Sequence, residues 1–258
     1  MNTQNIEKMS GHWLLAKVGK KVLRPGGKVL TLKMLNDLDI NPNDDVAEFA
    51  PGLGFTAEKV LAKNPQSYVG IDADEEAITL LKNKFRSSIA DFEKGHAAET
   101  GLKSETKTKV YGEAMLTMHA DHRKAEIIRE AHRILKTNGL YAIHELALTP
   151  NHLDENIKKQ IQRELAETIK VNARPLTLEE WESVLEKEGF TSMKTETAPM
   201  HLLEPSRMIS DEGFGGFLKI AKNIILKPEI RHRILKMKNI FKKYGKNMCA
   251  VIIVAKKD

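Results

Sequence analysis

The sequence feature that most constrains the fold is a glycine-containing loop between an apolar run and a helical pattern. Val46 and Ala47 precede the stretch EFAPGLG (48–54), which leads into the helical pattern FTAEKVLAKN. This order predicts a strand, a tight turn and a helix, with the turn at the helix N-terminus. Because glycines let the backbone approach a ligand closely, the unit suits a nucleotide-like molecule.

The elements around this unit alternate in type. We predict strands at 46–50, 67–72, 109–116 and 140–148, and helices at 28–40, 56–63, 75–85 and 122–136. The stretch 87–95 fits either type. The alternation predicts an α/β fold with a doubly wound parallel sheet. After Pro150 the pattern changes, and we expect helices at 153–171, 177–188, 206–226 and 229–244, with strands at 191–198 and 248–256.

Two classes of ligand compete for the loop. Residues 52–57 read GxGxxA, a dinucleotide fingerprint, whereas Glu48 followed by the glycine turn fits S-adenosylmethionine (SAM). Both ligands call for an acid about 20 residues further on, and Asp72 lies 20 positions after Gly52. Glu48 favours SAM, because a carboxylate repels a pyrophosphate and attracts positive sulfonium and ammonium groups.

A second stretch supports the same choice. EAHRILKTNGLYAIHEL (130–146) is similar to the ExxRxLKxxG pattern before the fifth strand of class I SAM-dependent methyltransferases. Together with the loop and Asp72, it makes the chain resemble that family, in its small-molecule group that includes the ubiquinone and menaquinone biosynthesis methyltransferases. The resemblance covers 44–148 and extends more loosely over 175–200.

The resemblance implies an architecture for the whole chain. It implies a Rossmann-like, mainly parallel seven-stranded sheet with an antiparallel last strand, plus N-terminal and late helical cover segments. We expect a single domain over 1–258, with an N-terminal helical cap at 1–43 and a SAM-binding core at 44–148. The remainder, 149–258, would supply the substrate side, with a helical insertion at 200–246.

The resemblance also implies roles for individual residues. The loop would pack against the methionine and adenosine parts of SAM, Asp72 would bind the ribose hydroxyls, and Ala73 would lie beside the adenine. Where the family often has an acid facing the adenine amino group, this chain has His96 and Ala97. The expected cofactor-binding residues are Glu48, Ala50, Pro51, Gly52, Gly54, Asp72, Ala73, His96, Ala97 and Glu113.

Arg24 and several histidines are further candidates. Arg24 could donate a bidentate pair to the carboxylate of the methionine part of SAM. A general base is needed only where the attacking group still carries a proton, and histidine suits this task because its pKa lies near working pH. We take His144, His119 and Tyr111 as catalytic candidates. The histidines weighed as bases are His12, His119, His122, His144 and His201.

Composition narrows the class of protein. The one cysteine, Cys249, excludes an internal disulfide and a multi-thiolate metal site, and we predict no metal. The N-terminal stretch MNTQNIEKMSGHW lacks the apolar core of a signal peptide, and no apolar run approaches the roughly 20 residues that cross a bilayer. We therefore expect a cytoplasmic protein.

The net charge of +6 is unevenly distributed. The segment 217–246 contains ten lysines and arginines and one acid, Glu229, which leaves about −3 on the rest of the chain. Within it, 228–246 predicts a helix with one apolar stripe among basic residues. The segment is either a solvated helix docked on the domain, or a surface attracted to an anionic membrane or an anionic substrate. Aromatic residues are few there, which argues against nucleic acid; a homodimer contact remains open.

These observations lead to one functional prediction and its rivals. We predict methyl transfer from SAM to an O, N, S or C nucleophile of a small-molecule metabolite, with S-adenosylhomocysteine as the other product. The alternatives are a SAM-binding protein or partner subunit without turnover, and a methyltransferase for a lipophilic, membrane-associated substrate. A dinucleotide oxidoreductase is disfavoured by Glu48.

Overall fold

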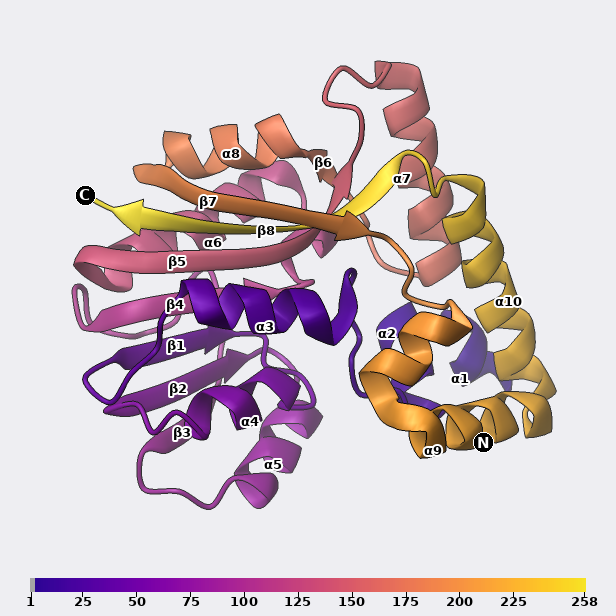
Figure 1. Cartoon of the computed structure of the whole chain (residues 1–258), viewed down its shortest axis with the longest axis horizontal. Helices are drawn as coiled ribbons and strands as arrows, with labels where there is room; N and C mark the ends of the chain where they lie inside the picture. The colour runs from indigo at the N-terminus through magenta and orange to yellow at the C-terminus, as the bar shows by residue number, and fades with distance from the viewer. Residues whose placement is uncertain (1–2) are drawn as a thin grey trace.

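A twisted sheet runs through the molecule. The computed structural model describes residues 3–258, and its strands follow the order β3-β2-β1-β4-β5-β8-β7 (Figure 1). The strands are β1 (Asp45–Phe49), β2 (Ser67–Asp72), β3 (Ala90–Lys94), β4 (Lys107–Glu113), β5 (Leu135–Leu148), β7 (Phe190–Pro199) and β8 (Met248–Lys257). The pairs among β1 to β5 are parallel, and β8 is antiparallel to both of its neighbours.

Five helices cover the two faces of the sheet. The apolar side chains of α3 (Gly27–Asp37), α4 (Phe55–Leu61) and α5 (Glu75–Lys84) form one buried cluster with one face of the strands. Those of α6 (Asp121–Ile134) and α8 (Leu178–Lys187) form another on the opposite face. Successive strand residues point to opposite faces, so Ala142 belongs to the first cluster and Tyr141 to the second.

A third helical layer lies at the end of the sheet where the parallel strands finish (Figure 1). It comprises α1 (Thr3–Lys8), α2 (Gly11–Lys17), α7 (Glu155–Ile169), α9 (Pro205–Leu226) and α10 (Pro228–Lys243). Their buried apolar residues share one core with the end of β5. Arg233 of α10 joins the layer, because its guanidinium donates to the carbonyls of Ile6, Met9 and Thr168. The N-terminal and late segments therefore cover the carboxyl ends of the strands.

The expected fold class is confirmed, with local differences. The six strands predicted by range are present, and the undecided stretch 87–95 contains a seventh, β3. A short extra strand, β6 (Leu176–Thr177), pairs with β5. The fourth strand ends at Glu113 rather than at 116, because a 3₁₀ turn (Leu116–Met118) follows it. Helix α6 ends at Ile134, before the predicted 136, since Leu135 already adopts an extended conformation.

Helix α9 departs from regular geometry at Gly213. This residue has φ 74° and ψ 166°, so α9 consists of two helical halves joined at a kink. Within residues 3–258 we find no helix that combines the length and apolarity needed to cross a membrane.

Candidate active site

A polar cleft of about 170 Å³ lies where β1, β2 and β4 end. Its walls come from the loop 50–53, the residues after β2, and the segment 113–118. The N-terminal segment closes it with residues of α2 and of the turn that follows. Carboxyl ends of parallel strands around a change in strand order are where α/β folds bind ligands. The position of the cleft therefore fits the ligand predicted for the loop.

Backbone conformation shapes the loop 50–54. Ala50, Gly52 and Gly54 all have positive φ values, of 55°, 54° and 71°. A Cβ at Gly54 would lie 2.5 Å from the Leu81 side chain, so the close packing of α4 on α5 requires glycine there. At Gly52 a Cβ would meet little else than the Ala50 carbonyl oxygen at 4.0 Å. Gly52 thus leaves open space in the wall of the cleft for a ligand to approach the backbone.

Asp72 joins the loop to the end of β2. Its carboxylate accepts from the backbone N–H of Gly52 and from that of Asp74, both at 3.0 Å. Burial raises the pKa of Asp72, against the lowering effect of these two hydrogen bonds. Each carboxylate oxygen retains a second lone pair, so Asp72 can still accept from ligand hydroxyls in the cleft.

Glu113, at the end of β4, is the centre of a buried polar network. Its carboxylate pairs with Arg24 Nη1 at 2.5 Å and with His144 Nδ1 at 2.7 Å, and accepts from the hydroxyls of Thr31 and Thr56. Burial alone would raise its pKa, but the Arg24 charge and the His144 contact outweigh burial and lower the pKa to about 2. Glu113 is therefore an anion that holds the 24–31 segment against the cleft.

Glu48, on the neighbouring strand β1, is a second buried carboxylate, and its pKa is shifted in the opposite direction to that of Glu113. It is 4% exposed, it lies beneath the loop, and its carboxylate accepts from the hydroxyls of Tyr68 and Tyr111. Burial raises its pKa to about 7, although the two hydrogen bonds oppose the shift. We therefore correct the expectation that Glu48 faces the cationic part of SAM, because its side chain is enclosed by the sheet and does not line the cleft.

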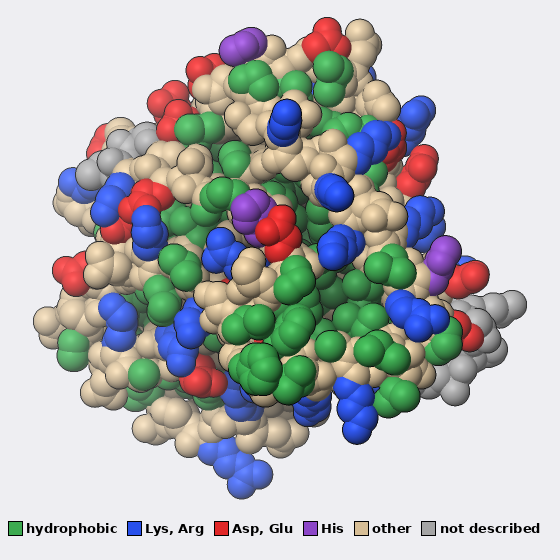
Figure 2. Space-filling view, turned by 45° about the vertical axis from the view of Figure 1, so that its right-hand side comes forward, with side chains coloured by type: hydrophobic (Ala, Val, Ile, Leu, Met, Phe, Trp, Pro, Cys, Tyr) green, Lys and Arg blue, Asp and Glu red, His purple; other side chains and the backbone are tan. Residues whose placement is uncertain are grey.

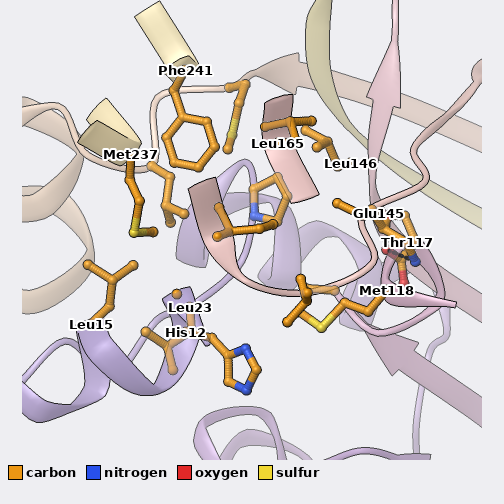
Figure 3. A pocket seen from close by; sticks show the side chains of 18 residues that line it. His12, Leu15, Leu23, Thr117, Met118, Glu145, Leu146, Leu165, Met237 and Phe241 are labelled. Carbon is orange, nitrogen blue, oxygen red and sulfur yellow. Dashed lines mark hydrogen bonds between the residues drawn. The ribbon is translucent and has the colours of Figure 1, made fainter. Parts of the chain in front are cut away.

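An apolar cavity of about 80 Å³ adjoins the cleft (Figure 3). Aliphatic, methionine and aromatic side chains line it, from α2, the end of β5, α7, α10 and the segment before α9. They include Leu15, Leu146, Leu165, Met200, Met237 and Phe241. The cavity and the cleft share four lining residues, which are His12, Leu23, Ala114 and Met118. A ligand in one space therefore lies directly beside a ligand in the other.

Glu145 of β5 fixes the wall between the two spaces. It is fully buried and accepts from the backbone N–H groups of Met115, Leu116 and Thr117 at 2.9, 2.7 and 3.2 Å, and from the Thr117 hydroxyl at 2.7 Å. Burial raises its pKa, and these donors partly offset the effect. Four hydrogen bonds from one short segment show that Glu145 organises the backbone after β4.

His12 lies at the junction of the cleft and the cavity, and its ring is seen at the edge of the apolar lining in Figure 3. Its Nε2 lies 3.3 Å from the Ser10 hydroxyl. Burial lowers the pKa of His12, against the raising effect of the Asp74 charge. The neutral ring, which can accept a proton, is therefore the dominant form at neutral pH.

The structure brings six of the expected cofactor residues to the cleft and places five elsewhere. Arg24, Ala50, Pro51, Gly52, Asp72 and Glu113 line it. Besides Glu48, four expected residues do not. Gly54 is buried beneath α5. Ala73 and His96 are exposed beyond the ends of β2 and β3, and Ala97 packs on the cluster that α6 and α8 form with the sheet.

The three catalytic candidates need correction. His144 is 0% exposed, and its two ring nitrogens are taken by Glu113 and by the Pro25 carbonyl oxygen at 2.6 Å. Tyr111 is also 0% exposed and donates its hydroxyl to Glu48. His119 follows the 3₁₀ turn and is not among the residues that line either space. His144 and Tyr111 therefore support the site from within the core, and His119 lies outside both spaces.

The sequence gives no signal that separates His12 from the other histidines, and none that marks the apolar lining. The side chains of Leu23, Met115 and Met118 meet the cleft only through the tertiary fold. No motif marks them, because an apolar residue facing a cavity and one facing a core have the same local pattern.

The fold and the site together define a class I methyltransferase architecture, and comparison with known proteins agrees. Residues 46–139 match the family model described as a methyltransferase domain. An uncharacterized protein of Haemophilus influenzae is 32% identical over 235 residues, which cover 90% of this chain and 91% of that protein. Residues 46–139 of this chain therefore form a methyltransferase domain, and the fold around them is that of the class I SAM-dependent methyltransferases.

Two solved structures share the fold. The [4+2]-cyclase SpnF has a TM-score of 0.71 at 16% identity, over 98% of this chain and 93% of that one. A geranyl diphosphate methyltransferase in complex with SAM has a TM-score of 0.66 at 11% identity, over 89% of this chain and 85% of that one. At these identities the likeness concerns the fold alone.

Proposed function

We propose that the protein transfers the methyl group of SAM, bound in the polar cleft, to a small and mainly apolar acceptor held in the adjoining cavity. The observation that carries the proposal is the contact between the two spaces through His12, Leu23, Ala114 and Met118. An acceptor in the cavity can point its nucleophile at a ligand in the cleft, and such positioning supplies much of the acceleration in a group transfer.

The cleft offers complementary groups to each part of SAM. Asp72 would accept from the ribose hydroxyls, and the open backbone at Gly52 would lie against the ligand. Arg24 has Nη1 committed to Glu113, and the rest of its guanidinium would face the carboxylate of the methionine part. When bound, SAM supplies a methyl group that its sulfonium already activates.

The lining of the cavity indicates the acceptor class. Apart from His12 and Glu145, the side chains around it are apolar or, at Thr117, already hydrogen-bonded to Glu145. Such a lining favours an acceptor with a hydrocarbon or aromatic body and one nucleophilic atom. The nucleophile attacks the methyl carbon as the bond from sulfur to that carbon breaks. Where the nucleophile is a hydroxyl or thiol, its proton passes to His12.

Transfer of a labelled methyl group tests the proposal. The protein would be incubated with methyl-labelled SAM and a panel of phenols, thiols, amines and prenyl alcohols, while released S-adenosylhomocysteine is measured. We expect label in an apolar acceptor. Calorimetry that shows no binding of SAM or S-adenosylhomocysteine would contradict the proposal.

A matched variant separates the two spaces. Ala173 is 1% exposed and lines the cavity but not the cleft. Ala173→Phe should fill the cavity and lower kcat/KM by about 100-fold or more, with the SAM dissociation constant changed less than about threefold. If this variant keeps full activity, the acceptor binds elsewhere.

A SAM-binding protein without methyl transfer is the second candidate. The shared fold of a [4+2]-cyclase shows that this architecture also occurs in a protein named for another activity. SAM binding with no transfer to any acceptor class would favour this candidate over the first.

A further inference from the structure

We propose that the second half of α9 is a docking surface for an anionic lipid membrane. The surface, here called the α9 patch, consists of the exposed apolar residues Phe214, Leu218, Ile225 and Leu226 and the exposed lysines Lys219, Lys222 and Lys227. It does not depend on the proposed acceptor, because it lies outside both the cleft and the cavity.

The apolar exposure of this helix is unusual for a surface helix. Phe214, Leu218 and Ile225 are 65%, 50% and 64% exposed, and their spacing of 4 and 7 places them on one helical face. Leu226, beside them, is 65% exposed. The other face is apolar as well, since Ile220 is buried in the helical core and Phe217 and Ile224 pack against it. An apolar side chain left in water has no stabilising role in the isolated protein.

The positive charge around the α9 patch indicates that its partner is anionic. From Gly213 to Pro228 the sequence contains three lysines and no acidic residue, and the surrounding segment 217–246 carries a net charge of +9. Figure 2 shows hydrophobic side chains gathered on the face that brings α9 forward, with Lys and Arg side chains around them. Apolar side chains within a basic border match the acyl region and the anionic headgroups of a membrane. A second copy of this chain would bring like charges together.

The structure holds the α9 patch in a fixed relation to the site. In the first half of α9, Asp211 pairs with buried Lys20 at 3.4 Å and accepts from the Lys28 N–H at 2.8 Å. Glu212 accepts from the N–H groups of Lys21 and Val22 at 2.8 and 2.9 Å. These contacts clamp α9 to the segment that carries Leu23 and Arg24, so docking would place the cleft and the cavity at the membrane surface.

The kink at Gly213 separates the clamped half from the docking half. A Cβ at Gly213 would find no atom within 4 Å, so the chain is open to solvent there. After Leu226 the chain turns at Lys227 into α10, whose Met237 and Phe241 line the apolar cavity.

Sedimentation with lipid vesicles tests the inference without any activity measurement. The full chain would be mixed with phosphatidylglycerol–phosphatidylcholine vesicles or with phosphatidylcholine vesicles. We expect binding to the anionic vesicles at least tenfold stronger than to the neutral ones, falling as salt is raised. Equal binding to both, or no binding to the anionic vesicles, would overturn the inference.

Two sets of variants locate the contact. Lys219→Gln, Lys222→Gln and Lys227→Gln combined should weaken vesicle binding by roughly 100-fold, at about fivefold per lysine. The matched control neutralises three exposed lysines distant in sequence, Lys63, Lys82 and Lys103, and should change binding less than about fivefold. Equal losses in the two variants would show a general charge effect and overturn the assignment to α9.

The apolar part has its own pair of variants. Phe214→Ser, Leu218→Ser and Ile225→Ser combined should weaken vesicle binding by about tenfold or more. The control changes three exposed apolar residues of α3 and α5 to serine, namely Val29, Leu32 and Leu80, which are 47%, 43% and 42% exposed. This control should bind vesicles as the wild type does. Light scattering supplies the opposing outcome: a dimer in solution that the α9 variant alone converts to a monomer would assign the patch to a second copy.

Discussion

The polar cleft and the apolar cavity adjoin, yet each buries a carboxylate under different conditions. Glu113 in the cleft lies between Arg24 and His144, and its pKa falls to about 2. Glu145, in the wall of the cavity, accepts only from neutral donors, and burial raises its pKa. Charged partners therefore surround the carboxylate beside the polar cleft, whereas neutral N–H and hydroxyl donors surround the carboxylate beside the apolar cavity. This difference fits the proposed placement of a charged donor in the cleft and an apolar acceptor in the cavity.

The largest expected effect concerns the residue that both spaces share. With an acceptor hydroxyl or thiol identified by the transfer assay, His12→Asn should lower kcat by about 10²- to 10⁴-fold, because the proton acceptor is lost. The wild-type rate should rise with pH, and the midpoint of this rise should lie below pH 6.5, since burial lowers the pKa of His12. The SAM dissociation constant should hardly change.

The matched control is His122→Asn, because His122 is exposed on α6 and lines neither space. Full activity in His12→Asn with an unaltered pH profile would show that the junction needs no proton acceptor.

Removal of the Glu113 carboxylate should destabilise the protein, because the buried polar network beside the cleft depends on it. Glu113→Ala leaves Arg24 and His144 buried without their carboxylate, and we expect the free energy of unfolding to fall by about 3–5 kcal/mol. Urea denaturation measures the loss. Glu93→Ala, on the exposed edge strand β3, serves as control and should change it by less than about 0.5 kcal/mol. A similarly small loss for Glu113→Ala would mean that the network contributes little to the free energy of unfolding.

Titration of stability sharpens the contrast between Glu113 and Glu48. The pKa of Glu113 is lowered in the folded state, so its contribution is present above pH 4.5 and is lost as the pH falls toward 2. The pKa of Glu48 is raised to about 7, so the folded state loses stability as the pH rises from 4.5 to 7. Each shift corresponds to about 3 kcal/mol.

Thermal or urea unfolding at a series of pH values checks both signs. Glu48→Gln should remain hydrogen-bonded to the tyrosines and remove the loss between pH 4.5 and 7. A variant with the same pH dependence as the wild type would rule out Glu48 as its source.

The smallest expected effect concerns ligand affinity in the cleft. Asp72→Ala should weaken SAM binding by about 10- to 100-fold, the scale of one to two lost hydrogen bonds to a charged acceptor. Calorimetry measures the change, and Glu93→Ala again serves as control. Asp72 also accepts from the Gly52 N–H. An unchanged affinity for SAM would therefore show that Asp72 holds the loop in place and does not bind the ligand.

Two of the expected site features differ in how far local sequence could locate them. The loop 50–54 and Asp72 are recognisable because their conformations and spacing are local requirements of a strand–loop–helix unit. His144 was a reasonable candidate by its place at a strand end, but burial and two hydrogen bonds occupy it. The expectation failed because a strand position does not reveal which partners face it.

What the sequence by itself determined is the order and type of the elements, and with them the α/β fold and the polar cleft. Periodicity and glycine positions are written in neighbouring residues, so they can be read without distant contacts. The tertiary structure alone decided that Arg24 meets Glu113, that His12 lies between the two spaces, and that α7 and α10 enclose the apolar cavity. Those contacts join residues far apart in the chain, and packing rather than local pattern selects them.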